Sequence, residues 1–93
     1  MRLNEYEIKS ILDSCRLYDS NAIVYLFGSR VDDTKKGGDI DLLVMSDKLT
    51  RDNKRAIRIR LHELLGEQKI DIIVAVDDSD PFVRMALETG VKL

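Results

Sequence analysis

The sequence predicts an α/β (α+β) fold, in which a small mixed three-stranded sheet is flanked by helices in the order α-β-α-β-α-β-α. Short apolar runs alternate with amphipathic stretches along the chain, and clusters of turn residues separate them. The amphipathic stretch between the second and third apolar runs is long enough for a right-handed crossover, so these two strands should be parallel neighbours. With 93 residues, the chain has room for one modest core, and we expect residues 1–93 to form a single domain.

The first helix has a clear beginning. Asn4 can cap it, and Glu7 stands three residues later in the capping-box position. Its inward stripe is expected to contain Ile8, Ile11, Leu12 and Cys15. A turn at 19–21 then leads to the run Ala22–Phe27, which has the length and the β-branched and aromatic content of a buried strand.

The remaining elements follow from turn, cap and periodicity signals. We expect a short helix or turn at 30–36 ended by Gly37-Gly38, a strand at 38–45, a helix at 51–65 between Thr50 and Gly66, a strand at 69–76, and a last helix between Asp80-Pro81 and Gly90. Phe82, Met85 and Ala86 are expected to pack the last helix onto the sheet.

Composition excludes several classes of protein. No apolar run approaches the roughly 20 residues of a membrane span, and the first ten residues lack the apolar core of a signal peptide. A net charge of −2 argues against a general nucleic-acid binder. The single cysteine rules out an internal disulfide and suits a reducing compartment, so a cytoplasmic location is expected.

Three acidic residues lie in or beside apolar strands, where an unpaired carboxylate is costly. Asp39 and Asp41 share one face of the second strand, because successive side chains alternate. Asp71 stands between isoleucines in the third strand, and it would lie beside them if it faces the same side of the sheet. Upstream, Gly28-Ser29 ends the first strand and lets the backbone approach a phosphate. Carboxylates beside a phosphate cradle indicate a site for a divalent metal and a nucleotide.

Gly28-Ser29, nine residues, and then Asp39-Ile40-Asp41 form a pattern that resembles the signature of the DNA polymerase beta-like nucleotidyltransferases. The short chain and its Phe-Gly-Ser-Arg segment resemble the minimal nucleotidyltransferase (MNT) branch. The resemblance extends over nearly the whole chain, including the closing Ala-Leu-Glu-Thr-Gly-Val segment.

The resemblance implies a nucleotidyltransferase fold and a role for each site residue. Asp39 and Asp41 would bind two Mg²⁺ ions, and Asp71 would bind the catalytic ion and help to activate the attacking hydroxyl. Gly28 and Ser29 would hold the triphosphate, and Arg30 would pair with phosphate. The implied reaction transfers a nucleotidyl group, expected to be AMP from ATP, to a hydroxyl and releases pyrophosphate.

A protein partner is also implied. The chain has no room for a separate acceptor-binding domain, so the acceptor surface must come largely from another chain. Small relatives of this kind often accompany a helical HEPN protein, in several cases as the antitoxin of a toxin–antitoxin pair that adenylylates the toxin. A homo-oligomer stays open, and the sequence indicates no membrane partner.

Two features leave alternatives to this interpretation. The chain departs from residues that are common in the family at Val31-Asp32-Asp33-Thr34 and at Gly38. The two added acids, Asp32 and Asp33, would repel a triphosphate unless they turn outward. The alternative is a non-catalytic nucleotide- or metal-binding subunit that masks a partner protein. One side of the third helix carries Arg51, Arg55, Arg58 and His62, which is either a solvated face or a docking surface for an acidic partner or nucleic acid.

Overall fold

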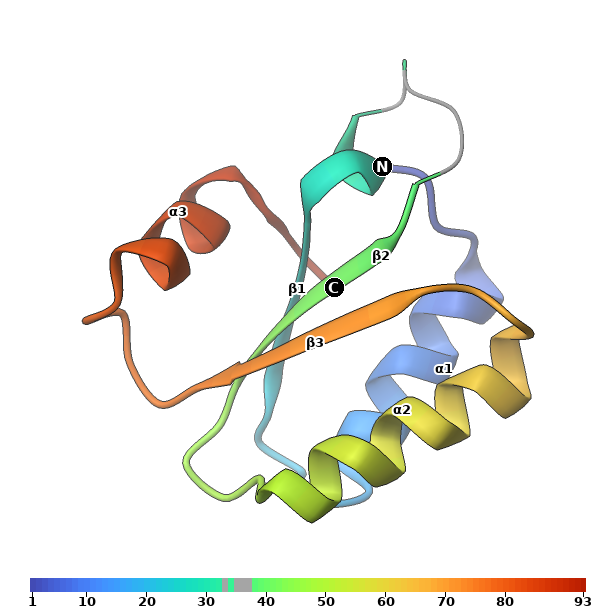
Figure 1. Cartoon of the computed structure of the whole chain (residues 1–93), viewed down its shortest axis with the longest axis horizontal. Coiled ribbons are helices and arrows are strands. Elements are labelled where there is room, and N and C mark those ends of the chain that lie inside the picture. Colours follow the sequence, from blue (N-terminus) through green and yellow to red (C-terminus); the bar gives the residue numbers. More distant parts are fainter. Residues whose placement is uncertain (33, 35–37) are drawn as a thin grey trace.

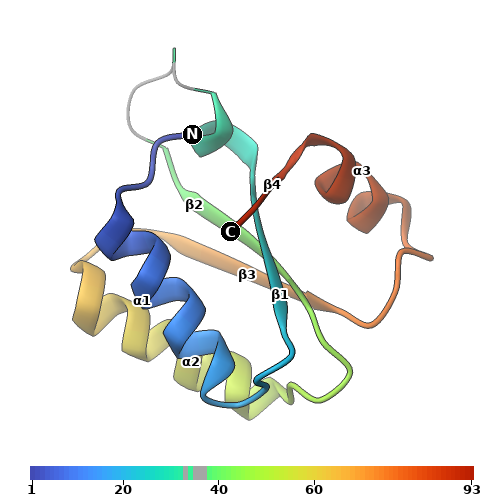
Figure 2. The same ribbon diagram turned by 180° about the vertical axis from the view of Figure 1, so that it is seen from behind.

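A computed structural model describes residues 1–32, 34 and 38–93. Within these residues a four-stranded sheet has the strand order β3-β2-β1-β4. Helices α1 and α2 lie together against one face of the sheet, and α3 lies on the other side, near one edge (Figure 1). The view from behind shows the N-terminus next to the short helix that follows β1 (Figure 2). The predicted fold class is confirmed.

Helix α1, Glu5–Arg16, begins with the predicted capping box. The amide of Glu7 donates to Asn4 Oδ1 at 2.8 Å, and the amide of Asn4 donates to Glu7 Oε1 at 3.0 Å. Ile11 and Cys15 are fully buried beneath this helix. Cys15 is therefore a core residue, as predicted. Its burial raises the pKa of the thiol to about 11.

Strands β1, Ile23–Phe27, and β2, Ile40–Met45, pair antiparallel. Between them the chain forms a 3₁₀ helix, η1, at Gly28–Val31. Strand β2 begins two residues later than the sequence indicated. Of the predicted turn at 30–36 and its closing glycines, residues 33 and 35–37 lie outside the described part of the chain.

Helix α2, Arg51–Leu65, has the predicted bounds, with Thr50 as its cap and Gly66 at its end. Strand β3, Ile70–Ala75, follows it and pairs in parallel with β2. The predicted crossover is therefore confirmed. Its register places Asp41 directly opposite Asp71, and this pairing positions the candidate site.

The C-terminal region corrects the predicted number of strands. Helix α3, Pro81–Thr89, starts at the predicted Asp80-Pro81 pair and ends at Gly90, but a short strand, β4, Val91–Lys92, follows it. This strand pairs antiparallel with β1 at the edge that β2 leaves free. Two residues are too few to produce an alternating pattern, so the sequence did not reveal the fourth strand.

The packing of α3 also differs from the prediction. Ala86 is buried as expected, together with Val83, but Phe82 and Met85 are 46% and 40% exposed. The Phe82 ring still packs against the sheet, in a T-shaped pair with Phe27 of β1 at a centroid distance of 5.7 Å. The helix therefore buries Val83 and Ala86 on the sheet, with Phe82 at the margin of this contact and Met85 more exposed than predicted.

Side chains from the two faces of the sheet form two separate apolar clusters. Leu42, Val44 and Ile72 point toward α1 and α2, whereas Phe27 and Leu43 point toward α3. Because side chains alternate along a strand, Asp41 and Asp71 belong to the α3 face. In the described part of the chain, no helix is both long enough and apolar enough to cross a bilayer.

Candidate active site

The structure brings two of the three predicted acids together. Asp41 and Asp71 are the second residues of neighbouring parallel strands, and their register pairing puts both side chains on the same face. The two carboxyl groups lie within hydrogen-bonding reach of each other. Burial raises the pKa of Asp41, and the negative charges of Asp71 and Asp39 raise it further, while Lys69 opposes them. Asp71 itself is exposed to solvent.

Asp39 lies beside this pair but contacts a cation. Its Oδ2 is 3.5 Å from Lys69 Nζ, in a pair whose two side chains are largely exposed. The amide of Ile40 donates to the carbonyl of Lys69 at 3.0 Å. The start of β2 and the segment that leads into β3 are therefore joined by a hydrogen bond just before Asp41 and Asp71. The charge of Asp39 still acts on Asp41, although its carboxylate is turned toward Lys69.

Gly28 lies against Asp41, because Phe27, the last residue of β1, is the register partner of that acid. The φ angle of Gly28 is +77°, which L side chains rarely adopt. A Cβ at this position would also collide with the Asp41 carboxylate. The Gly-Ser corner and Asp41 are therefore in direct contact, as a shared site requires.

Ser29 and Gly38 form the second contact of this corner. Gly38 has a φ of +95°, and a Cβ there would overlap the Ser29 hydroxyl. Family members commonly have serine or threonine before the Asp-x-Asp, and this structure explains why the chain departs from that pattern. A side chain at position 38 would displace the Ser29 hydroxyl, which the family resemblance implies as a phosphate ligand.

Arg30 is placed differently from the other predicted site residues. Its Nε donates to the Gly38 carbonyl at 3.2 Å, its Nη1 to the Arg2 carbonyl at 3.0 Å, and its Nη2 to Gln68 Oε1 at 3.0 Å. All three acceptors are neutral oxygens of the protein. Sequence reasoning missed Arg2 and Gln68, because they are distant in sequence from Arg30 and match no motif.

The Asp32 side chain stabilises a local turn. Its Oδ1 accepts hydrogen bonds from the amide and hydroxyl of Thr34, at 2.9 and 2.6 Å. One of the two added acids is therefore held by neighbouring donors on the exposed surface. Asp33 lies outside the described residues.

Comparison with known families gives a single clear result. The family model described as "Polymerase beta, Nucleotidyltransferase" matches residues 7–93, which is most of the chain. The chain belongs to this nucleotidyltransferase family. No curated protein matches the sequence significantly.

The nucleotidyltransferase family uses divalent metal, and the donor atoms at this site suit one. Carboxylate oxygens are the ligands that Mg²⁺ prefers, and adjacent carboxylates that repel each other gain from a cation between them. Over residues 1–32, 34 and 38–93, however, no three Asp, Glu, His or Cys side chains are grouped so that they could hold a metal ion. In this nucleotidyltransferase, Asp41 and Asp71 are paired across β2 and β3, whereas Asp39 contacts Lys69.

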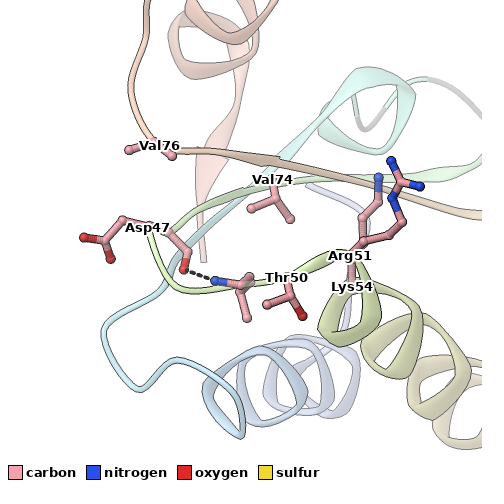
Figure 3. Close-up of a pocket in the computed structure, with 8 residues that line it drawn as sticks. Asp47, Thr50, Arg51, Lys54, Val74 and Val76 are labelled. Atoms are coloured by element: carbon pink, nitrogen blue, oxygen red, sulfur yellow. Dashed lines mark hydrogen bonds between the residues drawn. The ribbon is translucent and has the colours of Figure 1, made fainter.

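A hollow of about 330 Å³ lies elsewhere on the nucleotidyltransferase domain (Figure 3). Val74 and Val76 line it from the β3 side, and Arg51 and Lys54 line it from the first turns of α2. It lies where β2 and β3 end, whereas Asp41 and Asp71 lie where these strands begin. At the usual rise per residue, Val74 and Val76 lie roughly 10 and 17 Å from Asp71 along the strand. The hollow is therefore separate from the acidic site.

Proposed function

We propose that this nucleotidyltransferase transfers AMP from ATP to a hydroxyl group on a partner protein, with Mg²⁺ as its cofactor. In this reaction the hydroxyl oxygen forms a bond to the α-phosphorus, the bond from that phosphorus to the pyrophosphate oxygen breaks, and the hydroxyl loses its proton. The proposal rests chiefly on one observation: Asp41 lies beside Asp71 and against Gly28, in a chain of a nucleotidyltransferase family.

Each part of the site has a role in this proposal. Gly28 and Ser29 would bind the triphosphate, through backbone N–H groups and the Ser29 hydroxyl. Asp39, Asp41 and Asp71 would hold the divalent cation, which, when bound, neutralises phosphate charge and makes the attacking hydroxyl more acidic. Asp71, the most exposed of the three, would accept the proton from the incoming hydroxyl.

We further propose that the acceptor belongs to a separate chain of the HEPN type, as in the toxin–antitoxin pairs of the MNT branch, in the cytoplasm. Asp71 is exposed and lies on a strand at the edge of the sheet, so a hydroxyl from a second protein can reach it without passing through the core. Residues 1–93 would then act as one minimal domain whose acceptor surface is supplied by the partner.

The experiment uses the full chain, a candidate HEPN-type partner, Mg²⁺ and ATP labelled at the α-phosphate. We expect label on the partner with the wild type, none with Asp41→Ala, and wild-type transfer with Asp47→Ala, which changes an exposed acid near the distant hollow. Transfer that persists in Asp41→Ala would overturn the proposal.

The same experiment separates the enzyme from a subunit that only masks its partner. The masking function is favoured by one observation, the contact of Asp39 with Lys69, which leaves the three acids without a shared cation site. It predicts a stable complex in both the wild type and Asp41→Ala, with no label transferred by either.

A further inference from the structure

We propose that Arg30 is a positioning residue that joins the Gly28-Ser29 corner to the segments leading into β2 and β3, with Arg2 as its partner. In this role it holds the carboxylates in place and does not bind the nucleotide phosphates. The inference rests on the proposed function, because it concerns the same site, and it replaces the phosphate contact that the family resemblance implied for Arg30.

The guanidinium of Arg30 contacts both segments that carry the acids. Gly38, whose carbonyl it binds, directly precedes Asp39, and Gln68, whose side chain it binds, lies three residues before Asp71. A planar group with several fixed donors can hold two such segments at one spacing. A lysine keeps the positive charge but has a single ammonium group, so it cannot reproduce the arrangement.

Arg2 completes the arrangement from the other side. Its amide donates to the Arg30 carbonyl at 2.8 Å, its Nη2 donates to the Ser29 carbonyl at 2.9 Å, and its Nε donates to the Asp32 carbonyl at 3.0 Å. The Arg2 carbonyl in turn accepts from Arg30 Nη1. The N-terminal segment therefore binds three backbone carbonyls of the corner that contacts Asp41 and Gly38.

Gln68 distinguishes the two possible roles of Arg30. If Arg30 bound phosphate, removal of Gln68 Oε1 would leave the guanidinium free to do so, and function would be retained or improved. If Arg30 positions the acids, the same removal would break its link to β3. Gln68 also donates to the Leu65 carbonyl at 2.9 Å, so its substitution requires a separate check of folding.

The test compares Arg30→Lys and Gln68→Leu with the control Arg60→Lys, which changes an exposed residue of α2. Hydrogen exchange is measured on the partner-free chain at the amides of residues 38–41 and 69–71, with the core of α1 and α2 as the internal reference. Mn²⁺ affinity is measured on the same samples by calorimetry, and the kinetics of transfer from ATP are measured with the partner.

We expect both site variants to exchange faster at these amides while the helical core is unchanged. We also expect Mn²⁺ affinity to fall about tenfold, as is typical when residues supporting metal ligands are lost. The value of kcat should fall more than KM for ATP rises. Arg60→Lys should match the wild type in every measurement.

Two results would overturn the inference. The first is unchanged exchange at these amides in Arg30→Lys. The second is a rise only in KM for ATP in Arg30→Lys, with Gln68→Leu equal to the wild type, which would make Arg30 a phosphate ligand. If the wild-type chain neither binds Mn²⁺ nor transfers label, the proposed function fails, and the exchange measurement still decides the role of Arg30.

Discussion

At the scale of single residues, the site depends on the missing side chain of Gly28. Its backbone has a positive φ, and the Asp41 carboxylate fills the space where a Cβ would lie. Gly66 offers a natural comparison, because its φ is also positive, at +81°, but nothing lies within 4 Å of the position its Cβ would occupy. A substitution at Gly66 would therefore cost stability through backbone strain alone. A substitution at Gly28 would add a collision with Asp41.

We predict that Gly28→Ala abolishes label transfer, because the added methyl group displaces Asp41. Gly66→Ala should leave transfer intact. Both variants should lose stability by about 1–3 kcal/mol from the unfavourable backbone conformation, with an additional loss for Gly28→Ala. Urea unfolding and the transfer assay check these outcomes. Wild-type transfer by Gly28→Ala would show that the corner and the acid do not work together.

At the scale of secondary-structure elements, the packing of α1 includes one unfavourable group. Ser14 lies in the buried stripe of the helix with no exposed surface, and its hydroxyl has no hydrogen-bond partner among the described residues. A buried hydroxyl that loses its water without gaining a partner costs free energy. This position is therefore not optimised for stability.

We predict that Ser14→Ala raises the free energy of unfolding by about 1 kcal/mol, because it removes that penalty and alanine favours the helix. Urea denaturation should show a higher midpoint and an unchanged slope. Ser20→Ala, in an exposed turn, should stay within about 0.5 kcal/mol of the wild type. A lower midpoint for Ser14→Ala would mean that the hydroxyl makes a stabilising contact.

Helix α2 divides its surface between the core and solvent. It buries Ile57 and Leu61 completely, whereas Arg51, Arg55, Arg58 and His62 are all exposed, in keeping with their helical spacing. Ile59 is half-exposed on the same outer surface. The fold does not need these side chains, and a docking role for them stays a prediction.

At the scale of the whole molecule, the acidic site lowers the stability of the fold that carries it. The raised pKa of Asp41 means that the folded chain holds its proton more tightly than the unfolded chain does. The protonated Asp41 carboxyl therefore adds to the free energy of unfolding. This contribution is fully present below the unfolded pKa of Asp41 and is lost as the pH rises through its folded pKa. At neutral pH, the ionised carboxylate therefore opposes folding.

We predict that Asp41→Asn stabilises the metal-free chain at pH 7 by about 0.2–1 kcal/mol, the usual size of a cross-strand charge effect. The gain should shrink as the pH falls through the folded pKa, because the wild-type carboxyl then becomes neutral too. Thermal unfolding between pH 3 and 8 measures this, with Asp47→Asn as the control outside the site. Equal stability of Asp41→Asn and the wild type at pH 7 would contradict the prediction.

Features whose causes are local could be predicted from the amino-acid sequence. Caps such as Asn4, Thr50 and Asp80 act within three residues, and the periodicity of side chains acts within one helix or strand, so element positions were predicted closely. The crossover length was enough to make β2 and β3 parallel neighbours. The Gly-Ser and Asp-x-Asp residues predicted the region of the candidate site, and their roles stay predictions.

How these elements contact one another depends on the folded chain and could not be predicted. The pairing of Asp41 with Asp71 depends on strand register, and the contact of Asp39 with Lys69 depends on side-chain direction. Strand β4 pairs with β1 along the edge that β2 leaves free. The hydrogen-bond partners of Arg30, Arg2 and Gln68, lie 28 and 38 residues away in the chain. These contacts leave no local pattern, because each is created by two segments that come together only when the sheet has formed.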